Sequence, residues 1–164
     1  MSNYRHERCM HCGAKSVCPR KGAGRTIPYR TMPALELPAD LRIPSCGRCT
    51  RLFLDRMDKE TLSKVLQERY RASLHNRIRI AIDTLSQHIS QRKLECLIGI
   101  SQGYLSRLRA GDGNPSPELV GHLALLCQDP KTRLVELERF WCLPDDSWLP
   151  LQTPESLPKR RSIR

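Results

Sequence analysis

Two Cys-x-x-Cys pairs are the residues of this chain best suited to chemistry. Cys9 and Cys12 form the first pair, and Cys46 and Cys49 form the second. Each pair can place two thiolates on one tight turn, and two such turns supply the four sulfurs of a tetrahedral metal site. Four protein ligands fill the coordination shell of zinc, so the spacing predicts a structural Zn²⁺ site and not a catalytic one. Free thiols and redox-active pairs are the alternatives.

One histidine and the remaining cysteines bear on which side chains would hold the metal. His11 lies between the cysteines of the first pair, and we expect it to point away from a metal that both cysteines bind. Cys18 is a rival ligand that could replace one of the four. Cys96 and Cys127 fall in predicted helices, where a buried thiol behaves as a small apolar group.

A second stretch, residues 89–115, carries polar side chains in a pattern typical of DNA recognition. It predicts two short helices, about 91–98 and 102–109, joined by a tight turn at Gly99, where positive φ is cheap only for glycine. In a helix-turn-helix the second of these helices enters the major groove of DNA. A helical hairpin with merely solvated polar residues is the alternative.

The two helices of this stretch place their polar side chains at different parts of a duplex. Ser90 and Ser101 are expected to cap the helices, and the N-terminus of the first helix can hold a phosphate. Gln can pair with adenine and Arg with guanine, each through two hydrogen bonds. The residues expected to contact DNA are Gln91, Ser101, Gln102, Gly103, Tyr104, Ser106, Arg107 and Arg109.

Composition narrows the class of partner. The 164 residues carry a net charge of +11, which favours an anionic partner, with nucleic acid first. Residues 1–57 hold 11 basic and 4 acidic side chains, so the excess is concentrated there. No metalloprotease, phosphate-loop or nucleophile-elbow motif occurs, so we expect no enzyme. Without a long apolar run or an apolar leader, we expect a cytoplasmic protein that does not enter a membrane.

The elements that position these residues are predicted to be mainly α-helical. Asp58 is expected to be the N-cap of a helix whose apolar residues recur every four positions. This register weakens around residues 73–76, which predicts a hinge before a second helix. The expected units are a small β zinc ribbon (1–57), a connecting helix or linker (58–75), a five-helix helix-turn-helix domain (76–142) and a Pro-rich, basic, disordered tail (143–164).

These motifs resemble known families. Residues 76–128 are similar to the Xre/Cro-type helix-turn-helix family, and residues 9–140 resemble MqsA-type antitoxins in the spacing of the CxxC pairs, the helix that starts DKETLSKVL and the SQRKLE…SRLRAG…NPSP segment. The resemblance implies a bacterial, nucleoid-associated homodimer that binds a palindromic operator and represses its own operon. It also implies that the zinc domain holds a ribonuclease toxin. The positions that match the family's zinc ligands and base-reading arginine are Cys9, Cys12, Cys46, Cys49 and Arg107.

Three features depart from these families. Glu95 stands where the Xre family has a small Ala, so its charge must tilt outward or be paired. Gly103 stands where a family asparagine reads a base, so Gln102 or Tyr104 must compensate and the operator must differ. The basic ribbon would repel a basic ribonuclease, which favours contact with DNA or with an acidic protein.

Together the patterns predict a sequence-specific, DNA-binding transcription regulator, dimeric and repressing, that reads its operator through the helix at residues 102–109. It would act either as the antitoxin of a type II pair or as a regulator without a toxin. A protein-interaction adaptor and an RNA-binding zinc-ribbon protein are the alternatives from other classes.

Overall fold

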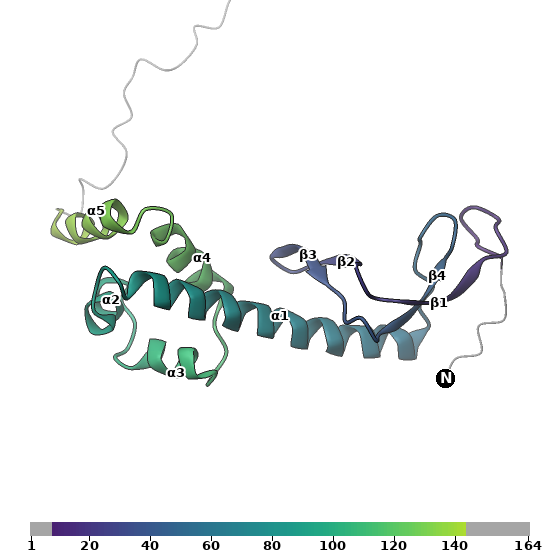
Figure 1. The fold of residues 1–164 in the computed structure, drawn as a ribbon, viewed down its shortest axis with the longest axis horizontal. Coiled ribbons are helices and arrows are strands. Elements are labelled where there is room, and N and C mark those ends of the chain that lie inside the picture. Colours follow the sequence, from purple (N-terminus) through teal and green to yellow (C-terminus); the bar gives the residue numbers. More distant parts are fainter. Residues whose placement is uncertain (1–7, 144–164) are drawn as a thin grey trace, which may run out of the picture.

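The computed structural model describes residues 8–143 of the chain, with four short strands followed by five helices (Figure 1). The strands lie along the N-terminal half of one long helix, and the shorter helices surround its C-terminal half. The predicted combination of a small β region and a helical region is therefore confirmed. All but the first residue of the expected tail (143–164) lies outside the described residues. The elements are β1 (Val17–Lys21), β2 (Thr26–Tyr29), β3 (Met32–Glu36), β4 (Arg42–Cys46), α1 (Arg56–Leu85), α2 (Gln91–Leu97), α3 (Tyr104–Ala110), α4 (Pro117–Leu126) and α5 (Pro130–Cys142).

The strands form two separate antiparallel pairs. β1 pairs with β4, from Val17 opposite Cys46 to Lys21 opposite Arg42, and β2 pairs with β3. The first pair has a small core of its own around Cys9, Val17 and Cys46. The second pair instead packs on α1 and shares the main hydrophobic core. Because β4 also contributes Ile43 to the main core, only the end of the β1–β4 pair near the CxxC turns depends on the cysteines for its interior.

The long helix α1 begins earlier than the sequence suggested. Its N-cap is Asp55, whose side chain accepts a hydrogen bond from the backbone N–H of Asp58 at 2.7 Å. The Asp58 carboxylate accepts in return from the backbone N–H of Asp55, which completes a capping box. The prediction of Asp58 as the N-cap was wrong by three residues, because either aspartate alone fits the N-cap preference.

The predicted hinge at residues 73–76 is absent, because α1 runs unbroken for 30 residues. Its buried residues step mostly by four, and each such step turns the apolar stripe by about 40° relative to a helix of 3.6 residues per turn. The stripe therefore winds around α1 and changes partner, from the β2–β3 pair to α3 and α4. The weakened register marks this change of partner within a continuous helix. The buried residues are Leu62, Leu66, Tyr70, Leu74, Ile78, Ala81, Ile82 and Leu85.

Tyr70 joins the β2–β3 pair to the middle of α1. Its hydroxyl lies 2.8 Å from Oγ1 of Thr31, and its ring meets that of Tyr29 edge-on at 5.6 Å. The Arg30 guanidinium lies 5.5 Å from both ring centroids, within the range of a cation–π contact. These contacts fix the β region on the same helix that carries the helical domain.

Candidate metal centre and nucleic-acid interface

The four cysteines of the two CxxC pairs meet at one end of the β1–β4 pair and form a possible metal site. All four Sγ atoms lie within 4.8 Å of one another, with Cys9 to Cys49 at 3.5 Å and Cys12 to Cys46 at 3.6 Å. Four sulfurs at about 2.3 Å from a central zinc ion lie about 3.8 Å apart. The donor set and its spacing therefore fit a tetrahedral metal ion.

Local hydrogen bonds prepare one of these thiols for ligation. The Ser16 hydroxyl lies 3.3 Å from Sγ of Cys46, and the backbone N–H of Arg48 donates to the same sulfur at 3.4 Å. The Ser16 hydrogen bond first, and then the backbone N–H groups of Cys49 and Arg48, lower the pKa of Cys46 to about 5. The lowered pKa favours the thiolate of Cys46, which is the form that binds a metal.

The rival ligands lie outside this cluster of sulfurs. His11 is exposed within the first turn, and Cys18 lies on β1 opposite Ser45.

A glycine lies in each CxxC turn. In the Cys9–Cys12 turn Gly13 has φ of +70°, which favours glycine. In the Cys46–Cys49 turn a Cβ on Gly47 would collide with the Arg20 guanidinium. That guanidinium is the far end of a flexible side chain, so Arg20 would have to move aside.

The predicted two-helix unit is present, with its second helix displaced. Ser90 caps α2 as expected, since its side chain accepts from the N–H of Lys93, and Gly99 makes the turn with φ of +70°. The second helix, α3, starts at Tyr104 and not at residue 102, and its N-cap is Gly103 with φ of +78°. The prediction of Ser101 as the cap was wrong.

A glutamate supplies the cap that Gly103 lacks. Glu95 is 2% exposed, and its carboxylate accepts from the backbone N–H groups of Gly103 and Leu105, each at 2.9 Å. The negative charge lies at the N-terminus of α3, where the free N–H groups and the helix dipole favour an anion. Glu95 is therefore paired and buried, the second of the two outcomes that the sequence left open, and it fixes α3 against α2.

The same carboxylate organises polar side chains on the outer surface. Nε2 of Gln91 donates to Oε1 of Glu95 at 3.1 Å and to Oγ of Ser106 at 2.6 Å. Gln91 thus links the start of α2 to the middle of α3. Its amide nitrogen is already engaged inside the protein, so a contact to a phosphate would have to share it.

Three of the predicted DNA-contacting side chains are exposed on α3 or in the turn just before it. Ser106 and Arg107 are exposed, as is Gln102 in the turn before the helix. The Arg107 guanidinium lies 5.9 Å from the ring centroid of the half-buried Tyr104, which orients it. Leu105 and Leu108 are fully buried on the opposite side.

Other predicted site residues have structural partners. Arg109 forms an ion pair with Asp83 of α1, with 2.6 Å between Nη2 and Oδ1. It therefore ties α3 to α1, and sequence reasoning had no signal for this partner because Asp83 lies 26 positions away. Gly103 contributes a left-handed backbone and a partly buried N–H, as described above. Ser101 is exposed next to Gln102 in the turn.

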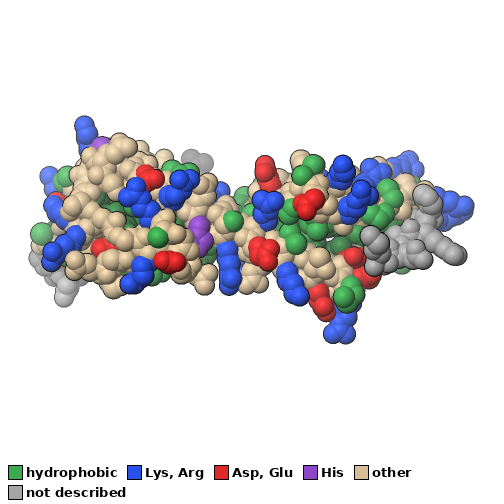
Figure 2. Space-filling view, turned by 60° about the horizontal axis from the view of Figure 1, so that its bottom comes forward, with side chains coloured by type: hydrophobic (Ala, Val, Ile, Leu, Met, Phe, Trp, Pro, Cys, Tyr) green, Lys and Arg blue, Asp and Glu red, His purple; other side chains and the backbone are tan. Residues whose placement is uncertain are grey.

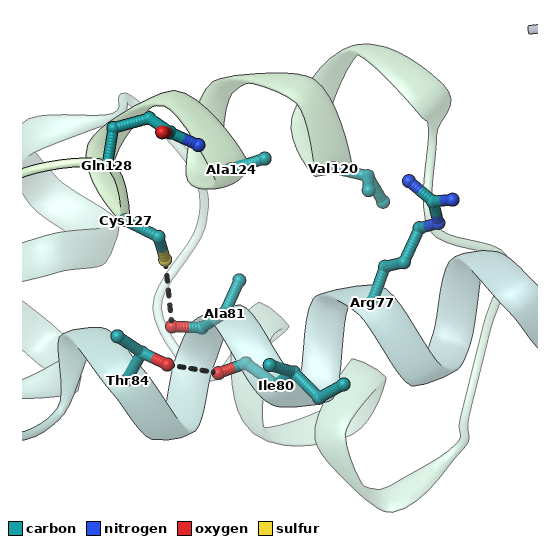
Figure 3. A pocket seen from close by; sticks show the side chains of 8 residues that line it. All are labelled: Arg77, Ile80, Ala81, Thr84, Val120, Ala124, Cys127 and Gln128. Atoms are coloured by element: carbon teal, nitrogen blue, oxygen red, sulfur yellow. Dashed lines mark hydrogen bonds between the residues drawn. The ribbon is translucent and has the colours of Figure 1, made fainter.

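A groove between α1 and α4 was missed by the sequence reasoning (Figure 3). It has a volume of about 240 Å³, and its walls are mostly apolar or small, with Arg77 at one end and Gln128 at the other. Ile80 on its wall is 54% exposed, and Leu125, on α4, is 65% exposed. The α4 sequence PELVGHLALL is apolar on most sides, which is unusual for a helix that keeps one face in water.

Comparison with known proteins adds no identity. No family model matches the chain, and no curated protein matches its sequence. Across residues 8–143, no helix has both the length and the apolar character needed to cross a membrane. The functional conclusion therefore depends on the geometry above.

Proposed function

We propose that this protein is a sequence-specific DNA-binding transcription regulator that reads base pairs through α3. The observation that supports it most is the Glu95 network, which caps α3 and links α2 to α3 through Gln91. This rigid support lets an exposed face with Gln102, Ser106 and Arg107 enter a major groove in a fixed orientation. Rigid positioning of a few side chains is what base-specific hydrogen bonding requires.

We propose Zn²⁺ as the metal held by Cys9, Cys12, Cys46 and Cys49. Four sulfur ligands leave no open position, so the ion would be structural. The β1–β4 pair buries only a few apolar side chains, and a bound ion would supply the missing cross-link between its two turns.

The regulator is proposed to act as a homodimer on a two-fold operator, with the α1–α4 groove as the face that a second copy covers. In Figure 1, α3 and α4 lie on opposite sides of α1, so a partner seated on the groove leaves α3 uncovered. Ile80, on the groove wall, is the exposed apolar side chain that a self-complementary contact would bury. Light scattering should find a dimer that Ile80→Glu converts to a monomer, while Val135→Glu on α5 does not. A monomeric wild type would contradict this part of the proposal.

Selection from a random duplex library tests the function directly. The full-length, zinc-loaded protein should enrich one sequence motif with two-fold symmetry, and binding to it should exceed binding to random DNA by about 10³-fold or more. Failure to enrich any motif would contradict sequence-specific reading. It would instead favour an adaptor that docks proteins, for which the apolar groove is the supporting observation.

The resemblance to MqsA-type antitoxins adds the proposal of a partner protein on residues 1–57. The excess of cations there favours an acidic partner over a basic ribonuclease. Copurification with the product of a neighbouring gene tests the proposed protein partner. If residues 1–57 bind no such protein, the partner proposal is contradicted and the DNA proposal is unaffected.

A further inference from the structure

The two segments that form the cysteine site share an unusual charge pattern. Residues 8–21 and 42–51, here called the cysteine module, comprise both CxxC turns and the strands β1 and β4. They contain seven Lys and Arg side chains and no Asp or Glu. A zinc ion with four thiolates carries two negative charges, so the loaded module remains strongly positive. The seven cations are Arg8, Lys15, Arg20, Lys21, Arg42, Arg48 and Arg51.

These cations are free to meet a ligand. All seven are exposed, and within the described part of the chain none forms an ion pair. The ion pairs that do occur join residues 56–138, where acidic side chains are plentiful. Lys and Arg side chains lie at the end of the molecule that carries the module, at the right of Figure 2, and others are spread over the rest of this face.

One pair of these cations is placed where it costs stability. Lys21 on β1 is directly opposite Arg42 on β4. Like charges at directly opposed positions of an antiparallel pair are destabilising, and no carboxylate of the module relieves them. An external anion that contacts both side chains would relieve this repulsion.

We propose that the cysteine module is a second nucleic-acid-binding surface, which holds the phosphate backbone of duplex DNA without reading sequence. Five of the seven cations are arginines, whose planar guanidinium groups suit phosphate oxygens. Met10 is the one large apolar side chain of the module among the exposed hydrophobic residues described. Protein interfaces usually bury an apolar centre, so this surface favours a phosphate backbone, which is bound through charge, over the protein partner considered above.

This surface is distinct from α3, and the proposal made for it does not depend on the function proposed for α3. The module lies at the far end of α1, a helix of 30 residues that spans about 45 Å. A duplex of arbitrary sequence is therefore the proper probe, because α3 has no specific site on it.

The test compares salt dependence of binding for two matched variants of the full-length, zinc-loaded protein. The module variant is Lys21→Gln/Arg42→Gln/Arg48→Gln, and the control, Lys59→Gln/Lys64→Gln/Arg71→Gln, removes the same charge from exposed positions of α1. The logarithm of the binding constant falls linearly with the logarithm of salt concentration, and each lost phosphate contact reduces the steepness of that fall by about 0.9. We expect the module variant to lose about 2 to 3 units of slope and the control to lose less than one.

Two further measurements separate binding from folding. Removal of the opposed charges should leave the zinc content unchanged and the melting temperature equal or higher. The charge-conserving variant Lys21→Arg/Arg42→Lys/Arg48→Lys should keep the wild-type slope. Equal loss of slope in the module variant and the control would overturn the proposal, as would a slope lost by the charge-conserving variant. Polyglutamate serves as a model of an acidic protein. A module variant that binds duplex DNA normally but no longer binds polyglutamate would also overturn the proposal.

Discussion

Replacement of Glu95 should loosen α3 from the rest of the protein. In Glu95→Ala two backbone N–H groups lose their acceptor: that of Leu105, which is buried, and that of Gly103, which is partly buried. Each unsatisfied buried donor costs about 1–3 kcal/mol, so the free energy of unfolding should fall by about 2–6 kcal/mol. Glu95→Gln keeps one carbonyl oxygen for the two donors and should cost about half as much. A small domain has only about 5–15 kcal/mol in total, so the effect is large.

Urea unfolding followed by circular dichroism measures the loss, and hydrogen exchange localises it. The amides of Gly103 and Leu105 should exchange much faster in Glu95→Ala, while those in the middle of α1 change less. Glu68→Ala, at an exposed position of α1, is the control and should change stability by no more than about 0.5 kcal/mol. A loss below about 1 kcal/mol for Glu95→Ala, with both amides still protected, would refute the capping role.

Three further changes test other parts of the structure. Gly103→Ala should cost about 1–2 kcal/mol in urea unfolding, because φ is +78° while the space around the new Cβ is open; no cost would contradict the observed start of α3. Cys46→Ser should abolish stoichiometric zinc by metal analysis and keep the helical dichroism signal, whereas Cys18→Ser should keep the metal; zinc retained by Cys46→Ser would contradict the proposed site. Arg109→Ala should lower the free energy of unfolding by at most about 1 kcal/mol, and by less in high salt, because its ion pair with Asp83 is about half exposed. A loss of several kcal/mol would contradict the description of this pair as a weak surface contact.

The local signals of the sequence were sufficient for the starts of α2, α4 and α5, but not for those of α1 and α3. Ser116 with Pro117 and Asp129 with Pro130 mark the starts of α4 and α5, since each combines a capping side chain with a proline in the first turn. The CxxC pairs were equally informative, because each spacing puts two sulfurs on one turn, and the pairing of β1 with β4 then brings the two turns together.

The features that sequence reasoning missed depend on tertiary contacts. A fixed spacing of four residues cannot show whether a helix breaks at residues 73–76 or changes its packing partner there. The burial of Glu95 depends on the position of α3, which only the folded chain supplies. Cys96 was expected to be buried and is exposed, because the apolar face of the short helix α2 is satisfied by Leu94 and does not reach it.

Binding of Arg107→Ala to the selected duplex motif tests the central claim most directly. Arg107 is the exposed guanidinium of α3 that Tyr104 orients, and the loss of a bidentate base contact costs about 1–3 kcal/mol, or roughly 5- to 150-fold in affinity. The account predicts this loss on the selected motif, little change on random DNA, and normal binding by the control Arg71→Ala. Unchanged affinity of Arg107→Ala for the selected motif would contradict base reading by α3.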